Sequence, residues 1–539
     1  MTRRTFLQYG GATAGAAATV SLAGCPSGDG DGDGDGGTPT EDDGDGGTPT
    51  DDEPDVPADF PVRITQGNMP SGLDPHDHRE TPTTVVMLHA YEGILARQPD
   101  GQIFENLATS YERVEPGHIR FEIRDDVQFH NGDDLTPADV AFSINRMVDP
   151  DVGFASPQRD QLAGVNEAQV ADGGGAVDVF SDGINPTVIS SFGTYCDVMQ
   201  QSWVEERERS AINQEMTGTG PFELDSYTEG EEVVLVRNEN YWDDLADPSE
   251  VTFTAAAESS TRVNQLLAEE TDVVVNVPPQ EITRVDNSDV ARIEAASSTR
   301  IIFNAMRYDI EPFSSQQFRQ AMNYAIDLES IVSNVLGGFG DQTGQPTLEG
   351  FVGHNADVDP YEFDPEEAER LVEESGHAGV ELELHTPVGR YLNDLQIARA
   401  VAGYIDDLEN VSASVNQRNF GSLVDDLSSG DIKDKPPWYL IGWGEATFDG
   451  GLVIEALLQT GATFSSFSNE QVDTMLANSF EQGGEERDQT LQELNALLHD
   501  LAPWIFLNRQ YSVYGTSSDI DWSARSDERI DAYEMSPSS

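Results

Sequence analysis

The residues that could perform catalysis do not fall into a spacing that a known mechanism needs. The sequence has no Gly-x-Ser-x-Gly turn to expose a serine nucleophile, no His-Glu-x-x-His pair for zinc and no Walker phosphate loop. Gly338, Gly340 and Gly344 close a helical pattern, whereas the glycines of a nucleotide cradle open one. Acids are so frequent that paired carboxylates carry no information about glycoside hydrolysis. The pattern favours a binding protein over an enzyme.

Two histidines and two cysteines remain as candidates for metal or thiol chemistry. His76 and His78 lie in a segment rich in proline and glycine with no cysteine nearby, so we expect a solvated loop and no metal site. Cys196 has no sequence-adjacent partner that suggests a nucleophile, so we expect a small buried hydrophobic residue. Two cysteines are too few for a disulfide framework, and nothing in the sequence calls for a cofactor.

The net charge excludes two classes of partner. The chain has 539 residues, with 29 lysines and arginines against 99 acids, which gives a formal net charge of −70. Nucleic acid and anionic lipid both need a basic surface, so we expect neither as a partner of the folded part. High charge is typical of disorder, but 37% hydrophobic residues are enough for a packed core. Concentrated salt screens surface repulsion, so we expect a halophilic, haloarchaeal protein.

Residues 1–24 predict an export signal. Arg3 and Arg4, followed by Phe-Leu, match the signature of twin-arginine (Tat) export. The apolar stretch at residues 10–24 is too short to span a membrane, and it ends in Leu-Ala-Gly-Cys. That tetrapeptide resembles a lipobox, in which the sulfur of Cys25 would carry a lipid. The alternative is a plain signal peptide with an incidental cysteine. One acyl chain anchors weakly, so a second chain or a membrane partner is implied.

Residues 25–59 predict an acidic, disordered tether between the anchor and the folded domain. Residues 26–59 hold thirteen acids, no lysine or arginine, and the repeat Asp-Gly-Gly-Thr-Pro-Thr at 35–40 and 45–50. This composition cannot bury a core, and its glycines and like charges keep it flexible and extended. The alternating Asp-Gly run lacks the glutamate spacing that a calcium loop needs.

Strands and helices alternate over residues 60–539, which predicts an α/β mixture. Apolar residues at every second position predict strands at 119–123, 233–236 and 380–384. A period of 3.6 predicts a helix from Phe318 to Val335 that stops at Gly337. Asp364 before Pro365 predicts a helix start, with the helix running to Gly376. Two further helices are predicted at 391–408 and 486–501.

Several sequence blocks resemble family 5 of the extracellular solute-binding proteins, the peptide-binding components of ABC importers. The blocks stand in family order at residues 101–111 (GQIFENLATSY), 121–132 (FEIRDDVQFHNG), 135–143 (LTPADVAFS), 218–222 (GTGPF), 237–242 (RNENYW), 318–327 (FRQAMNYAID), 442–444 (GWG) and 502–507 (APWIFL). Together they cover about residues 62–515. This order along the chain is far more specific than any single block.

The resemblance implies a two-lobed clamp of mixed α/β sheets with an extra subdomain inserted in lobe I. An open form would capture ligand, closure would bury it, and a membrane permease would recognise the closed form. The expected boundaries are residues 60–83, 189–298 and 498–539 for lobe I, 84–188 for the inserted subdomain and 299–497 for lobe II.

The resemblance also implies where a ligand would bind. Peptide binders of this family often hold the ligand's ammonium with an acid just after the Gly-Trp block, which makes Asp449 the first candidate and Glu445 the second. Arg390, next to Tyr391 between a strand and a helix, is the first candidate for a ligand carboxylate. Trp443 would stack on the ligand or line the cleft. The alternatives are a solvated loop for Asp449, a salt bridge for Arg390 and packing between lobes for Trp443.

The resemblance leads us to expect a lipid-anchored, monomeric binding protein on the outer face of the cell membrane, delivering short peptides to an ABC permease. The loop after the Gly-Trp block departs from the Asp-Pro-rich pattern of many oligopeptide binders, so an oligosaccharide or a nickel chelate stays open as the ligand. Presentation of ligand to a chemoreceptor is a second function. A secreted hydrolase is the least favoured one, because no nucleophile and base are apparent.

Overall fold

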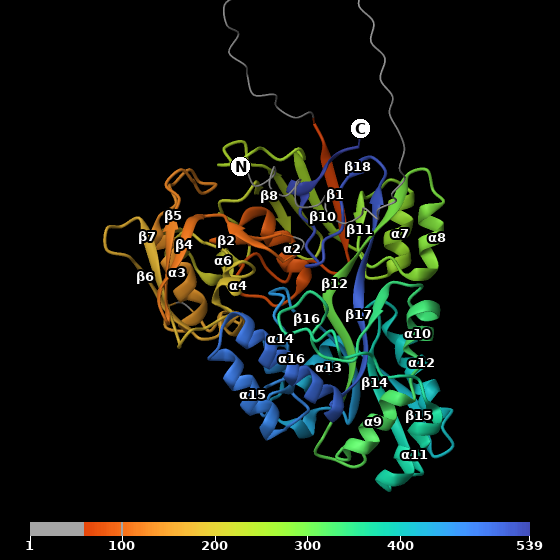
Figure 1. Ribbon diagram of the computed structural model, residues 1–539. Helices are drawn as coiled ribbons and strands as arrows, with labels where there is room; N and C mark the ends of the chain where they lie inside the picture. The colour runs from red at the N-terminus through yellow and green to blue at the C-terminus, as the bar shows by residue number, and fades with distance from the viewer. Residues whose placement is uncertain (1–58, 99–100, 153, 539) are drawn as a thin grey trace, which may run out of the picture.

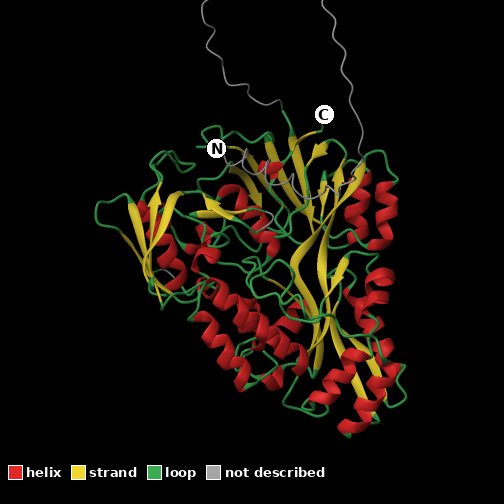
Figure 2. Cartoon of the chain, in the orientation of Figure 1, coloured by secondary structure: helices red, strands yellow, loops and turns green. Residues whose placement is uncertain are grey.

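The computed structural model describes residues 59–98, 101–152 and 154–538. The predicted signal peptide, Cys25 and all but the last residue of the predicted tether lie outside the described residues. The described part is a mixed α/β structure in which one large sheet runs down the molecule and helices pack on both of its faces in the lower half (Figures 1 and 2). This agrees with the predicted fold class.

One mixed sheet forms the frame of the molecule. Among the described residues it has eleven strands, ten of them in the order β15 (Val411–Arg418), β14 (Val380–Pro387), β16 (Trp438–Gly444), β12 (Ala291–Met306), β17 (Trp504–Ser517), β11 (Val273–Val274), β1 (Pro61–Gln66), β10 (Glu250–Ala255), β9 (Glu232–Arg237) and β8 (Phe222–Thr228). The eleventh, β13 (Gly340–Gln342), pairs with β17 off this path. Strand β1 is parallel to β10 and β11, and β14 is parallel to β15 and β16.

Strands β12 and β17 connect the two halves of the molecule. They pair antiparallel from Ala291 opposite Ser517 to Ala305 opposite Trp504, and both extend from the upper into the lower half (Figure 1). Their register shifts between Ser297 and Ile301, so residues 298–300 leave the regular ladder. A break in a ladder bends a strand and re-aims its side chains. The two long strands therefore cross from one lobe to the other with an irregular segment between.

The upper half, which we call lobe I, packs around β1, β8, β9 and β10, and an inserted subdomain has a core of its own. The inserted sheet has the order β4 (Ala108–Glu115), β5 (His118–Ile123), β7 (Ala176–Ser181), β6 (Val165–Val170). Its buried residues run from Ile94 to Val198 and include Cys196, which confirms the predicted burial of that thiol. The other elements of this half are β2 (Leu95–Arg97), β3 (Ile103–Glu105), β18 (Ile520–Asp521), β19 (Ser536–Pro537), α2 (Thr81–Ala90), α3 (Pro137–Val148), η1 (Arg159–Leu162), α4 (Val188–Phe192), α5 (Gln201–Glu205), α6 (Arg209–Ile212), α7 (Ser259–Leu267), α8 (Pro279–Asp286) and η4 (Ala532–Glu534).

The lower half, which we call lobe II, buries both faces of the sheet. Successive residues of β16 alternate between two cores, with Trp438 and Leu440 in one and Tyr439 and Ile441 in the other, as the two-residue period of a strand requires. One core includes α9 (Gln316–Tyr324), α11 (Pro365–Ser375) and α12 (Asp394–Asp406), and the other α14 (Gly450–Leu458), α15 (Glu470–Phe480) and α16 (Gly484–Leu501). The remaining elements are α10 (Leu328–Ser330), the π-helical turn η2 (Ile331–Val335), α13 (Phe420–Ser428) and η3 (Ile432–Asp434).

Most predicted elements are present, and one predicted helix is broken. The strands at 119–123, 233–236 and 380–384 are β5, β9 and β14, and the helices at 391–408 and 486–501 are α12 and α16. The predicted helix from 318 to 335 ends at Tyr324, because the Asp327 side chain accepts from the Ser330 N–H and starts a new turn. Helix α11 begins as predicted, with the Asp364 side chain accepting from the Glu367 N–H.

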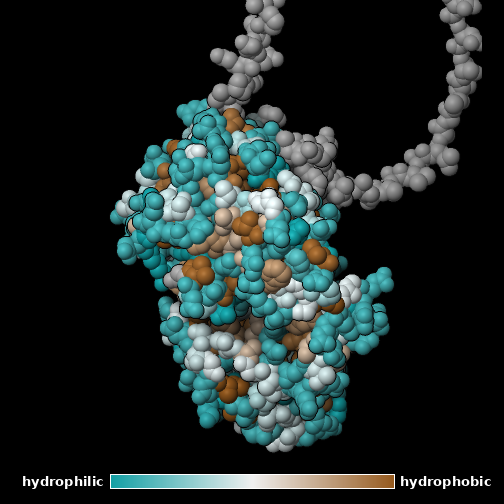
Figure 3. Space-filling model, turned by 90° about the vertical axis from the view of Figure 1, so that its left-hand side faces the viewer, coloured by the Kyte–Doolittle hydropathy of each residue, from teal (hydrophilic) through white to brown (hydrophobic). Residues whose placement is uncertain are grey.

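The face of the molecule drawn in Figure 3 is largely hydrophilic. The space-filling view shows mostly hydrophilic side chains with scattered hydrophobic ones (Figure 3). Seven large hydrophobic side chains are exposed among the described residues. The acidic composition is therefore carried on the outside of a packed protein, because charged groups keep their hydration there.

Candidate functional site

The loop at residues 445–449 connects the sheet to α14 and lies where the two lobes meet. It follows β16, whose Trp443 and Gly444 pair with Ile301 and Arg300 of β12. At its start the Glu445 N–H donates to the Thr299 oxygen at 3.1 Å, which ties the loop to the irregular segment of β12. At its end the Asp449 carboxylate accepts from the Gly451 N–H at 2.9 Å and caps α14.

Asp449, the first candidate for the ligand's ammonium, has its charge already paired. Its carboxylate is buried and makes a two-pronged ion pair with Arg487 of α16, with Oδ2 and Oδ1 at 2.7 and 2.8 Å from Nη1 and Nη2. Both side chains are at most 5% exposed. A buried pair of this geometry satisfies both charges. The predicted ligand contact of Asp449 remains a prediction, and the structure gives its carboxylate a role inside lobe II.

Glu445, the second candidate, is a buried carboxylate on which Arg79 and Arg97 act electrostatically without forming an ion pair. Its Oε1 accepts from the Thr447 N–H at 3.2 Å and from the Thr447 hydroxyl at 2.7 Å. No ion pair is formed by Glu445 among the described residues, and the side chain lies inside the protein. Burial raises the pKa of Glu445 to about 7, against a reference value of 4.5, because the charged form loses its hydration. The predicted ligand contact of Glu445 remains a prediction.

The Arg390 guanidinium forms no ion pair with a described residue, although the Glu528 and Asp394 carboxylates act on it electrostatically. The Asp394 carboxylate accepts from the backbone N–H groups of Gly389, Arg390 and Tyr391 at 3.0, 2.8 and 3.1 Å and so fixes the turn before α12. The Arg390 guanidinium lies over the rings of Tyr391 and Phe420, at 5.0 and 5.2 Å. Burial, with Arg300 nearby, lowers the pKa of Arg390. Leaving aside the exposed arginines, only Arg390 among the described residues has a guanidinium without a hydrogen bond or an ion pair to a described residue.

Tyr391 and Trp443 belong to the same two segments as Arg390 and Glu445. The Tyr391 hydroxyl donates to the Gly442 oxygen at 3.1 Å. A Cβ at Gly442 would lie 2.9 Å from the Tyr391 ring, so only glycine allows this close approach. Trp443 is half-buried, packs against Phe464 at 5.4 Å, and has an indole N–H without an acceptor among the described residues. Four of the five predicted residues thus lie along the joined segments at 390–391 and 442–445, with Asp449 at the far end of the loop.

Arg300 links these segments to lobe I, and no sequence pattern singled it out. Its guanidinium lies 5.9 Å from the Tyr391 ring and pairs with Glu528 of the C-terminal segment, at 3.0 and 2.7 Å. Glu528 has a positive φ of 62°, which is strained for a residue other than glycine. Nothing distinguishes Glu528 from 98 other acids in the sequence, and 228 positions separate it from Arg300. We call Arg300, Arg390, Tyr391, Trp443 and Glu445 the interlobe site.

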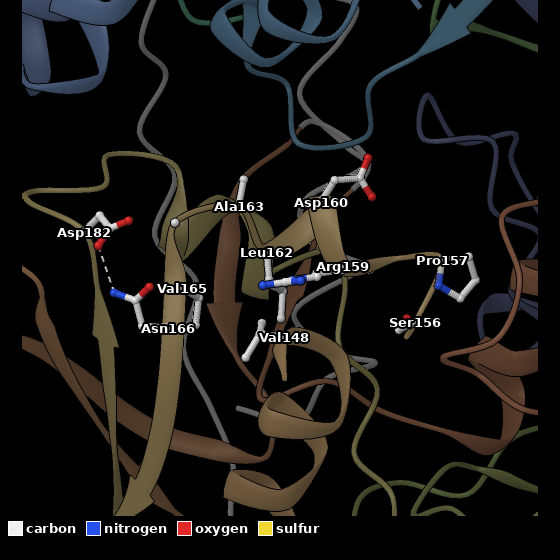
Figure 4. A pocket seen from close by; sticks show the side chains of 11 residues that line it. Val148, Ser156, Pro157, Arg159, Asp160, Leu162, Ala163, Val165, Asn166 and Asp182 are labelled. Carbon is white, nitrogen blue, oxygen red and sulfur yellow. Dashed lines mark hydrogen bonds between the residues drawn. The ribbon is translucent and has the colours of Figure 1, made fainter. Parts of the chain in front are cut away.

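A separate hollow of about 510 Å³ lies on the inserted subdomain (Figure 4). Some of its charged and polar lining residues already have partners within the protein. Asp160 forms an ion pair with Arg79, and the Asn166 amide donates a hydrogen bond to Asp182 at 2.9 Å. Its lining includes none of the predicted site residues.

The two histidines do not lie in a solvated loop. His76 is fully buried, with Nε2 2.8 Å from the Asp197 oxygen, and His78 is 8% exposed. The prediction was wrong because the segment packs under the ion pair between Asp74 and Arg146 rather than facing solvent. Among the described residues no group of three potential ligands could hold a metal ion, and no described helix is long and apolar enough to cross a membrane.

Comparison with known proteins shows the family to which the chain belongs. The family model described as "Bacterial extracellular solute-binding proteins, family 5 Middle" matches residues 102–465. This chain belongs to that family. It is therefore an extracellular solute-binding protein of the ABC-transporter type, and its family and relatives are binding proteins rather than enzymes, in agreement with the absence of a catalytic motif.

Individual relatives of this solute-binding protein have low sequence identity to it, but they match it over most of its length. The "Glutathione-binding protein GsiB" of Pectobacterium atrosepticum is 23% identical over 480 residues, covering 85% of this chain and 90% of the relative. The periplasmic binding protein DppA from Helicobacter pylori, solved with the peptide STSA, has a TM-score of 0.78 at 17% identity, covering 89% of this chain and 99% of DppA. A dipeptide-binding protein from Pseudoalteromonas sp. SM9913, solved with Met-Leu, has a TM-score of 0.78 at 18% identity, with coverages of 89% and 100%. These structures share its two-lobed fold.

Proposed function

We propose that this solute-binding protein captures short peptides with free ends between its lobes and delivers them to an ABC permease. The observation that carries the proposal is two charged groups of the interlobe site that form no ion pair among the described residues: the buried Glu445 carboxylate and the Arg390 guanidinium. A zwitterionic ligand would complete both. The relatives named for dipeptide and peptide ligands support this class.

The surroundings of the two charges suit a peptide in salty water. In molar salt an exposed charge pair contributes little, whereas a buried one keeps charge-assisted hydrogen bonds. Arg390 offers a planar fork that matches a carboxylate, and its position over Tyr391 and Phe420 holds the fork in one orientation. The half-buried Trp443 offers an apolar ring to a peptide side chain.

The cellular setting is part of the proposal. We infer export by the Tat route, cleavage before Cys25 and lipid attachment to its sulfur, with residues 26–59 as the tether of a monomeric binding domain at the outer membrane face. The charge of −70 supports a halophilic, haloarchaeal source.

Mass spectrometry of the ligand that co-purifies in molar salt tests the ligand class. We expect intact peptides of a few residues. A nickel chelate or an oligosaccharide would replace the peptide assignment, and a cleaved product would indicate a hydrolase. Genetic deletion, followed by separate assays of peptide uptake and chemotaxis, distinguishes delivery to a permease from presentation to a chemoreceptor.

A further inference from the structure

Two hydroxyl groups of the inserted subdomain form hydrogen bonds with the loop that carries Glu445. The Ser190 hydroxyl donates to the Thr447 oxygen at 2.7 Å, and the Thr194 hydroxyl approaches the Ala446 oxygen at 3.3 Å. Ser190 lies in α4 and Thr194 lies just after its end, one helical turn further along the chain. This short segment therefore contacts two consecutive backbone carbonyls of lobe II. These carbonyls would otherwise need water or another donor.

Arg97 orients both hydroxyl groups. Its Nη2 donates to the Ser190 Oγ at 2.8 Å and to the Ser190 backbone oxygen at 2.7 Å, and its Nε donates to the Thr194 Oγ1 at 3.0 Å. Each hydroxyl has one hydrogen, and each oxygen already accepts from Arg97. The Ser190 hydrogen is therefore directed to the Thr447 carbonyl, and the Thr194 hydrogen is shared between the Ser190 and Ala446 carbonyls.

Phe448 adds an apolar contact at the same place. Its ring lies 5.5 Å from the Arg97 guanidinium carbon, and a Cβ built on Gly101 would be 3.2 Å from that ring. Phe448 has a positive φ of 59°, which is rare for an aromatic residue and persists only where surrounding contacts enforce it. Contacts from the inserted subdomain are among those that enforce it.

We propose that Arg97, Ser190 and Thr194 form an interlobe clasp, which positions the Glu445 carboxylate and slows release of the ligand. The link is Thr447, whose oxygen is held by Ser190 while its N–H and hydroxyl hold the Glu445 carboxylate. Opening the lobes would free both loop carbonyls and remove the support of Phe448, so the loop could relax and Glu445 would lose its orientation. The effect on ligand rests on the proposed function, whereas the clasp itself does not.

The test compares Ser190→Ala combined with Thr194→Val against the native chain. The control is Ser181→Ala, since the Ser181 hydroxyl lies in the same subdomain but has no partner among the described residues. Hydrogen exchange of the as-purified proteins reports loop protection, and stopped-flow kinetics with trialanine reports binding. Two lost hydroxyl bonds predict faster exchange at residues 446–450 and dissociation faster by about tenfold, with association unchanged. The Thr194→Ser variant keeps the hydroxyl and should behave as the native chain.

The outcomes separate the clasp from the ligand assignment. Faster loop exchange in the double variant supports the clasp even if the native chain fails to bind trialanine, a result that would overturn only the peptide assignment. Unchanged exchange overturns the clasp. If trialanine binds but the double variant changes only the association rate, or if Ser181→Ala has the same effects, the clasp is also overturned.

Discussion

The backbone oxygen of Thr299 accepts from the Glu445 N–H at 3.1 Å, while the Thr299 N–H donates to the Ser526 oxygen at 2.9 Å. One residue of the irregular segment of β12 thus contacts the loop at residues 445–449 of lobe II and the C-terminal segment of lobe I. A small rotation at this point changes both contacts together, because each is a short backbone hydrogen bond. The interlobe site is therefore attached directly to residues 298–300 of β12, the irregular segment between the two lobes, where we expect the molecule to bend when the lobes move.

Replacing Glu445 with glutamine should weaken the binding of peptides with a free ammonium by about 10- to 100-fold, since a charge-assisted hydrogen bond contributes about 1.5–3 kcal/mol. Isothermal titration in molar salt measures the effect. N-acetylated peptides, which lack the ammonium, should bind the native chain and the variant equally. An equal loss for both peptides would mean that Glu445 acts only on the loop.

Peptide affinity should rise with pH up to about 7, because the ammonium binds the ionised form of Glu445 and the pKa of Glu445 is raised to about 7. Affinity should fall again above about pH 8, where the α-ammonium of the peptide loses its proton. Stability should change in the opposite direction. The native state keeps this proton where the unfolded chain, with its reference pKa of 4.5, has released it, so the free energy of unfolding falls as pH rises between these values. The contribution is at most about 3 kcal/mol. Denaturant unfolding of the ligand-free native chain and of Glu445→Gln, each measured across this pH range, isolates the contribution of Glu445. If the free energy of unfolding changed with pH equally in the two proteins, the raised pKa of Glu445 would be contradicted.

Replacing Arg390 with lysine should reduce the affinity for peptides with a free carboxylate by about tenfold or more, because lysine lacks the planar two-pronged fork. Peptides with an amidated C-terminus should lose much less. Arg399 lies exposed on α12 without a partner among the described residues, which makes Arg399→Lys the matched control. A similar loss for amidated and free peptides would show that Arg390 does not bind the carboxylate.

Replacing Asp449 with asparagine should destabilise lobe II by about 3–5 kcal/mol, because it leaves Arg487 buried without its partner. Chemical denaturation measures this, and Arg487→Gln in the same chain should recover part of the loss. Ligand affinity, measured below the unfolding transition, should change little. A large loss of affinity with unchanged stability would instead support the sequence-based assignment of Asp449 to the ligand's ammonium.

Replacing Cys25 with serine should move the protein from the membrane fraction to the medium in a haloarchaeal host, because the proposed lipid anchor needs the sulfur. Immunoblots of the fractions measure the shift. Cys196→Ser is the control, since that thiol is buried in the inserted subdomain. Retention of the Cys25→Ser protein on the membrane would argue against the lipid anchor.

The fold could be predicted well from the sequence, whereas the pairing of the charged residues in the candidate site could be predicted only in part. Hydrophobic patterns identified β5, β9, β14, α12 and α16, because their apolar faces pack on the cores that the pattern implies, and the capping pattern at Asp364 and Pro365 identified α11. Arg390 and Glu445 were among the candidates, but sequence alone ranked Asp449 first. Its pairing with Arg487, 38 positions away on another helix, depends on the packing of α14 against α16 and leaves no local pattern. The same holds for the contacts of Arg300 with Glu528 and of Ser190 with Thr447.

Strands β12 and β17 run through both lobes and pair along nearly their whole length. Neither lobe can be cut out as a separate polypeptide without halving these two strands and exposing their edges. Heat or denaturant should therefore melt the two lobes in one cooperative transition despite their separate cores. The inserted subdomain, whose core runs from Ile94 to Val198 as one continuous stretch, is the piece that an engineer could delete or transplant.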